Sequence, residues 1–228
     1  TLVVIENGCA SNPLSRSINF VIKTSVIPSG SSYMHFAGPT VKDISYTTQT
    51  GVRLEQFNMT TLDTYAYEWD PSVNYSTNNP WLNVWPFEYN VPVANGLAIT
   101  NWVAGTGTME MEGTLVVETF TDYTVNYYGN NAEEWELISN PYPTAISFAD
   151  FYSSNSSLIY NKFRIYDSGN NWFDYTSTNG ESPQIQVGQG LMVQVRPGAS
   201  GQLTFNTSIR DHNDIAFRSP DQSNFKVA

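Results

Sequence analysis

The sequence predicts an all-β protein, an antiparallel β-sandwich of jelly-roll-like type that carries one short helix near 147–155. Three observations favour this fold class. Short runs of β-branched and aromatic residues recur along the 228-residue chain, and clusters of Gly, Pro, Asn and Ser separate them. Few stretches show the apolar spacing that an amphipathic helix needs. Charged residues make up only 14% of the chain and aromatic residues also 14%, a balance typical of β-rich extracellular proteins.

The predicted elements are short and end at turn-forming residues. The clearest strands are 18–22, 114–119, 163–166 and 191–195. The stretch DSGNN at 167–171 lies between two aromatic strands and predicts a hairpin turn. The best helical signal covers 147–155, where Ser147 and Asp150 have the spacing of a capping box ahead of an aromatic face.

The helix follows an unusual stretch, SNPYP, that begins at Ser139. Each proline disfavours helical backbone in the residue before it, so the chain should stay extended through this stretch. The Asn140 side chain can close the turn where the preceding strand leaves its sheet. We therefore interpret Asn140, Pro141 and Pro143 as a structural turn.

The two halves of the chain resemble each other. Five segment pairs recur in the same order, roughly a hundred residues apart: 32–40 with 134–141, 62–70 with 159–167, 81–84 with 172–175, 95–99 with 189–193, and 107–111 with 201–205. We expect an internal duplication, with leading strands in 1–29 that continue from an upstream region, a first half in 30–120 and a second half in 121–228. Each half alone has few strands and long exposed edges, so we expect both to pack as one unit.

Charge and composition exclude several classes of function. A formal net charge of −11 repels phosphate backbones and argues against nucleic-acid binding. No apolar run approaches the roughly 18 residues that span a bilayer, so we expect no membrane-spanning segment. Cys9 is the single cysteine, which rules out an internal disulfide. The chain starts without Met in strand-like sequence, and we expect a mature or excised piece of a longer polypeptide.

The aromatic run WLNVWPFEY at 81–89 is the main candidate binding site. In an extended strand, Trp81, Trp85 and Tyr89 would share one face and form a platform for sugar rings. The alternative is that this face packs in the core. Pro86 weakens the assumption of a continuous strand.

Other candidate sites have weaker signals. Asp211 and Asp214 lie in RDHND, a polar stretch that offers the oxygen ligands that calcium prefers, although its spacing matches no recognised calcium loop. Glu110 and Glu112 would share one face of a strand, as a glycosidase pair requires, but so does any half-buried strand with outward carboxylates. Recognised catalytic and nucleotide-binding motifs are missing, so we expect no enzyme and no cofactor other than calcium.

The stretch SNPYPTAI at 139–146, followed by an aromatic helix, resembles the "GNPYPSAI" segment of large secreted Bacteroidota proteins exported by type IX secretion. The resemblance continues in order through 163–167, 187–193 and 203–210, and more weakly through 34–39 and 95–97. It implies a β-sandwich module upstream of a C-terminal sorting domain, which is not present in these residues and through which the type IX machinery would act. It assigns no catalytic residues.

Two functions follow as expectations. The first is a non-enzymatic secreted or cell-surface module that serves adhesion, assembly or spacing in a larger exported protein. The alternative is a carbohydrate-binding module that uses exposed aromatic residues between Trp81 and Tyr89. The expected partners are surface glycans or neighbouring protein domains. A hydrolase that uses Glu110 and Glu112 is the third hypothesis.

Overall fold

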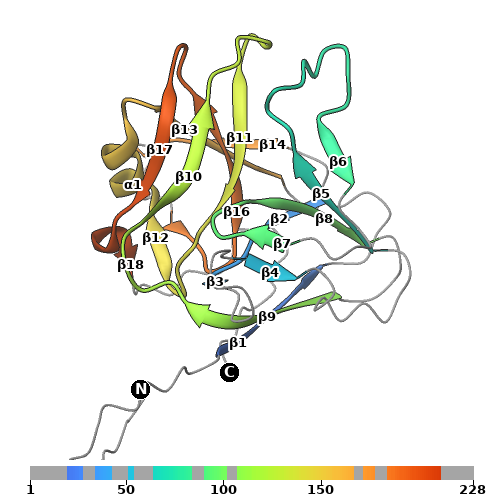
Figure 1. Cartoon of the computed structure of the whole chain (residues 1–228), viewed down its shortest axis with the longest axis vertical. Helices are drawn as coiled ribbons and strands as arrows, with labels where there is room; N and C mark the ends of the chain where they lie inside the picture. Colours follow the sequence, from blue (N-terminus) through green and yellow to red (C-terminus); the bar gives the residue numbers. More distant parts are fainter. Residues whose placement is uncertain are drawn as a thin grey trace, which may run out of the picture.

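Strands dominate the computed structural model, which describes residues 20–27, 34–42, 51–53, 64–83, 90–101, 107–166, 172–177 and 184–211. Neighbouring strands pair in antiparallel fashion, as in β1 with β9 and β11 with β16, and one α-helix packs beside them (Figure 1). The all-β, sandwich-like fold class is therefore confirmed. Among the described residues, no helix is long and apolar enough to cross a membrane.

The elements follow one another in two series. The first series is β1 (Phe20–Ile27), β2 (Met34–Ala37), β3 (Val41–Lys42), β4 (Gly51–Arg53), β5 (Thr64–Trp69), β6 (Trp81–Asn83), β7 (Asn90–Pro92), β8 (Leu97–Asn101) and β9 (Gly107–Leu115). The second series is β10 (Phe120–Asn126), β11 (Glu134–Ser139), β12 (Ala145–Ser147), α1 (Phe148–Asn155), β13 (Ile159–Tyr166), β14 (Trp172–Tyr175), β15 (Gln184–Ile185), β16 (Gly190–Val195), β17 (Ser200–Phe205), the 3-10 helix η2 (Thr207–Ile209) and β18 (Arg210–Asp211).

One strand is shorter than its sequence predicts. The run 114–119 indicates a strand, but β9 ends at Leu115, which pairs with Val41 at the start of β3. Val116 is still buried, whereas Val117 is exposed. The two strands are antiparallel, so the first residue of β3 is opposite the last residue of β9. Because β3 begins at Val41, the ladder between β9 and β3 ends at Leu115.

Two four-stranded sheets share one order of strands. The first runs β2-β8-β5-β6 and the second β11-β16-β13-β14. These strands are the ones that the similar sequence segments contain, so β2 corresponds to β11, β8 to β16, β5 to β13 and β6 to β14. Isolated bridges join the sheets at Ala37 with Gln189 and at Asn95 with Ile138. An internal duplication predicts this arrangement, and the duplication and the boundary near residue 120 stay predictions.

Two glycines allow the sheets to approach closely. A Cβ on Gly190 would lie 2.8 Å from the carbonyl carbon of Phe36, and a Cβ on Gly96 would lie 2.6 Å from Leu137 Cγ. Real Cβ atoms do not approach other atoms so closely, so both positions need glycine. Gly190 thus lets the start of β16 pass close to β2, and Gly96 lets the chain that enters β8 pass close to β11.

The larger apolar core lies in the second series of elements. Ser147 caps α1 by accepting the Asp150 backbone N–H at 3.3 Å. The helix buries Phe148 and Phe151, and the Phe151 ring lies 4.8 Å from the Phe205 ring on β17. Figure 1 shows α1 beside β17 and β12. The predicted helix therefore forms where the capping signal placed it.

A smaller cluster joins the two four-stranded sheets. Its buried members are Phe36, Ala98, Trp135, Leu137 and Met192. Partly buried aromatic residues pack around this cluster, which places a layer of rings between the two sheets.

The SNPYP segment connects β11 to β12 and is tied to its surroundings through Asn140. This side chain is fully buried. Its oxygen accepts the Tyr142 N–H at 2.9 Å, and its amide donates to Thr144 O at 2.7 Å and Gln186 O at 3.1 Å. Tyr142 is also buried, and its hydroxyl donates to the carbonyl oxygen of Phe205. These hydrogen bonds join the turn to the residue that follows β15 and to β17.

Candidate functional site

An open cleft of about 670 Å³ lies beside the aromatic layer, between the β5–β6 connection and the sheet that contains β11, β13 and β14. Its aromatic lining consists of Trp69, Tyr75, Trp81, Trp135 and Trp172. Tyr75 and Trp172 are 39% and 43% exposed, whereas Trp135 is 4% exposed. The cleft therefore has a buried aromatic base and solvent-accessible aromatic walls.

The first wall comes from the β5–β6 pair. Trp69 ends β5 and Trp81 begins β6, and the two residues are direct partners in the ladder. Their rings lie 4.9 Å apart at 72°. The Trp69 indole N–H donates to Trp135 O at 2.7 Å, and the Tyr75 ring lies 6.1 Å from Trp69. This hydrogen bond fixes the wall against β11.

The second wall comes from the β13–β14 pair and has a similar geometry. Tyr166 ends β13 and pairs with Trp172, which begins β14. Their rings lie 4.9 Å apart at 71°. Phe36 lies between the walls, 6.0 Å from Trp81 and 5.6 Å from Trp172. The two walls thus repeat one edge-to-face arrangement.

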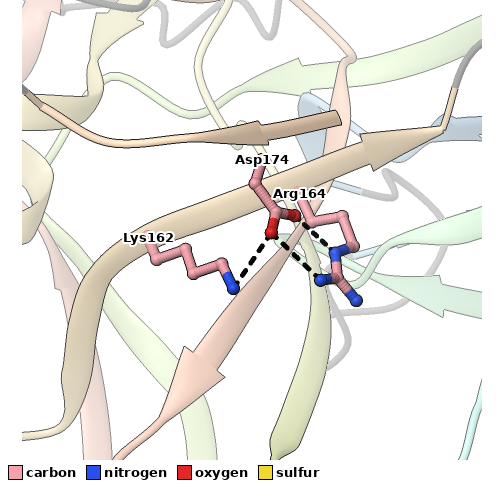
Figure 2. Close-up of polar contacts among 3 residues, drawn as sticks. All are labelled: Lys162, Arg164 and Asp174. Atoms are coloured by element: carbon pink, nitrogen blue, oxygen red, sulfur yellow. Dashed lines mark hydrogen bonds and ion pairs between the residues drawn. The ribbon is translucent and has the colours of Figure 1, made fainter. Parts of the chain in front are cut away.

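A cation lies between two of the tryptophans. The Arg164 guanidinium carbon is 4.3 Å from the Trp135 ring centre and 5.6 Å from that of Trp172. Asp174 holds it through Nε–Oδ1 and Nη2–Oδ2 distances of 2.6 Å and 3.1 Å, and Lys162 Nζ lies 3.0 Å from the same carboxylate (Figure 2). The hydrogen bond from Arg164 is the largest of the effects that lower the pKa of Asp174.

The loop that closes the first wall, residues 70–80, will be called the cleft loop. Side-chain oxygens shape it by accepting the backbone N–H two residues further on. These bonds join Asp70 to Ser72 at 2.9 Å, Asn74 to Ser76 at 3.0 Å, and Asn79 to Trp81 at 3.1 Å. Such turns hold the backbone of an exposed loop without a sheet partner.

Two asparagines hold the cleft loop against the β10–β11 connection. Asn131 accepts the Tyr75 N–H at 3.1 Å and donates to Val73 O at 3.0 Å. Asn130 donates to Ser72 O at 2.6 Å. Figure 1 shows the two connections side by side at the top of the molecule. The cleft loop is therefore held in place by the second series of elements.

Glu134 organises the segment that carries these asparagines. It is 2% exposed. Its carboxylate accepts the backbone N–H of Asn130 at 2.7 Å and that of Tyr128. The next residue back, Glu133, accepts the Tyr75 hydroxyl through its carbonyl oxygen at 2.6 Å. A buried carboxylate thus supports the cleft wall indirectly.

A second buried carboxyl lies on β11 away from the cleft. Side chains alternate along a strand, so Glu136 points to the face opposite Trp135. Glu136 is 4% exposed, and Tyr123 donates its hydroxyl to it at 3.2 Å. Burial raises the pKa of Glu136 to about 8. This carboxyl group does not line the cleft.

The structure places only some of the residues that the sequence singles out. Trp81 lines the cleft, whereas Trp85 and Tyr89 lie outside the described residues. Asp211 lies on β18 and accepts a hydrogen bond from Gln184, and Asp214 lies outside the described residues. Within the described ranges, no group of three or more His, Cys, Asp and Glu residues is placed to hold a metal ion.

Glu110 and Glu112 lie on β9, opposite Lys23 and Val21 of β1. The structure describes only the backbone here, so the proposed carboxylate pair lies outside the described side chains.

Sequence reasoning missed most of the cleft. Trp69, Trp135, Arg164 and Trp172 come from four different strands. One signal was present, because a hairpin predicted around 167–171 would pair the strands that carry Arg164 and Asp174. The turn itself lies outside the described residues, but β13 and β14 do pair, with Arg164 opposite Asp174. Trp135 gave no comparable signal.

Comparisons with known proteins add no likeness: the chain matches no family model, no curated protein and no solved structure.

Proposed function

We propose that this chain is a non-enzymatic carbohydrate-binding module and that the cleft between the two aromatic walls is its binding site. The observation that carries the proposal is the exposure of Tyr75 and Trp172 in a concave site whose base is also aromatic. Aromatic surface in water is unfavourable unless something covers it. The C–H faces of sugar rings are apolar and pack against such rings.

The polar rim of the cleft fits the hydroxyl groups of a sugar. Ser76, Thr77, Asn78 and Asn79 line it from the cleft loop and are all exposed. Hydroxyl and amide groups both donate and accept hydrogen bonds, which is what a ring of sugar hydroxyls requires. A few polar groups around an apolar base is the usual composition of a small-molecule site.

The walls are held in place before any ligand arrives. The Trp69 indole N–H is hydrogen-bonded to the Trp135 carbonyl oxygen on β11. Asn131 fixes the backbone of the cleft loop at Tyr75 and Val73. A site whose side chains are already ordered loses less conformational freedom on binding. This rigidity favours recognition of a ligand over a purely structural role for the rings.

The resemblance to exported Bacteroidota proteins supports the setting of this proposal. In that setting the module is secreted or on the cell surface, and glycan binding makes it adhesive. Assembly and spacing within a larger exported protein are compatible with the same role.

The test is a glycan array with the labelled protein, followed by affinity measurements on the glycans that bind. Trp172→Ala should weaken binding about tenfold or more, because it removes a wall of the cleft. Phe173→Ala is the matched control, since Phe173 is 41% exposed on the same strand but does not line the cleft. Failure of the wild-type protein to bind any glycan, or equal losses in both variants, would refute the proposal.

A further inference from the structure

We infer, building on the proposed function, that the cleft binds a single uncharged oligosaccharide chain rather than an acidic glycan or the flat surface of an insoluble polysaccharide. Ring geometry, the size of the cleft and its charge balance each support part of this inference.

The aromatic rings of the cleft do not form a plane. Trp69 and Trp81 are inclined at 72°, and Trp69 and Tyr75 at 45°. At the other wall, the Trp172 ring is inclined at 48° to the buried Phe36 ring behind it. A flat crystalline surface can rest only on rings that share a plane. Inclined walls instead cover a chain that enters between them.

The cleft has the volume of a site for a few sugar units. Its volume of about 670 Å³ lies within the range of roughly 300–1,000 Å³ that small-ligand pockets span. Because the cleft is open to solvent, a longer chain can extend out of it while a short segment makes the contacts.

The charges at the cleft are already balanced. Arg164 lines the cleft, but Asp174 occupies its Nε and Nη2 groups and also binds Lys162. Glu133 adds a negative charge to the lining, and the whole chain carries −11. A sugar carboxylate or sulfate would meet a guanidinium whose charge Asp174 already offsets, and it would have to approach an acidic protein. An uncharged sugar meets neither cost.

The rim favours a sugar over a proline-rich peptide, the other common ligand of aromatic grooves. Such a peptide offers mainly carbonyl acceptors. Asn78 presents an amide oxygen and the second hydrogen of its amide nitrogen, and Asn79 presents an amide nitrogen beside an oxygen that already accepts the Trp81 N–H. Sugar hydroxyls can match both kinds of group, because they donate as well as accept.

The experiment compares four kinds of probe by calorimetry or pull-down. These are soluble neutral hexasaccharides of glucose, xylose and mannose, hexamers of galacturonic acid, crystalline cellulose, and a proline-rich peptide. We expect the best neutral hexasaccharide to bind at least about tenfold more tightly than the acidic hexamer. The affinity of the neutral hexasaccharide should change little in about 0.5 M salt, a concentration that screens exposed charges. Partition onto crystalline cellulose or a salt-sensitive preference for the acid would overturn this inference and leave the proposed function standing. Binding of no sugar, or of the peptide alone, would overturn both.

A variant tests the charge argument directly. Asp174→Asn keeps the shape of the side chain but removes the negative charge that offsets Arg164 beside the cleft, so the preference for the neutral hexamer should fall about tenfold. Asp150→Asn, on the first turn of α1, changes the net charge equally and should leave the preference unchanged. Identical preferences in the two variants would show that Asp174 does not set the charge selectivity.

Discussion

Glu136 provides a sharp test of the buried interior, through the substitution Glu136→Gln. The carboxyl group lies on β11 with 4% exposure, and Tyr123 donates a hydrogen bond to it at 3.2 Å. Burial is the largest influence on its pKa, which rises from 4.5 to about 8. Within this rise, the hydrogen bond from Tyr123 acts in the opposite direction, and the nearby Glu134 and Asp70 contribute in the same direction as burial. The folded protein therefore prefers the protonated acid.

The sign of the pH effect follows from proton binding. Between pH 4.5 and about 8 the folded state holds a proton that the unfolded state releases, so stability falls as the pH rises through this range. At about 1.4 kcal/mol per pH unit, the full interval corresponds to about 5 kcal/mol. Glutamine has nearly the shape of the protonated acid and cannot ionise. The variant should match the wild type near pH 4.5 and exceed it by several kcal/mol near pH 9.

The assay is urea unfolding of the wild type and of Glu136→Gln at intervals from pH 4.5 to pH 9. The lower limit is the normal pKa of a glutamate carboxyl group. Glu134→Gln is the control on the same strand. The Glu134 carboxyl group accepts three backbone N–H groups, one through Oε2 and two through Oε1. An amide can accept through one oxygen only, so the Glu134→Gln variant should lose about 1–3 kcal/mol of stability. Parallel stability curves for Glu136→Gln and wild type would refute the reasoning.

Two further variants test the turn and the cleft loop. Asn140→Ala should lower the free energy of unfolding by about 3 kcal/mol or more in urea titrations, because it leaves the Tyr142 N–H and several carbonyls unpaired in the interior; a loss below about 1 kcal/mol would contradict this role. Asn131→Ala should weaken glycan binding several-fold with a small change in melting temperature, because it frees the backbone at Val73 and Tyr75. Unchanged affinity would mean that the loop needs no such support.

The elements of the fold were largely predictable because their causes are local. Alternation and β-branched residues indicate β16, and a capping serine indicates the start of α1. The prolines of SNPYP disfavour helical backbone at Asn140 and Tyr142, ahead of the helix that Ser147 caps. The further bonds of Asn140 to Gln186 were not predictable, since they join segments far apart in the chain.

The candidate site was predictable only in part. Trp81 belongs to a visible aromatic run, and it does line the cleft. Trp135 and Trp172 lie on strands that meet only through the order β11-β16-β13-β14. A shift of one residue in any of these registers would turn a tryptophan to the opposite face. The residue pattern within one strand does not show in which register that strand pairs with its neighbours.

By itself the sequence determined the strand-forming segments, the turn before the helix, the helix cap and an acidic surface that disfavours nucleic acids. Each depends on residue type and near neighbours. Tertiary structure alone decided which aromatic rings face the cleft, that the Arg164 guanidinium lies over the Trp135 ring there, and that Glu136 is buried with a raised pKa. These properties arise from strand pairing and burial between distant segments, because both ring orientation and desolvation depend on what packs against a side chain.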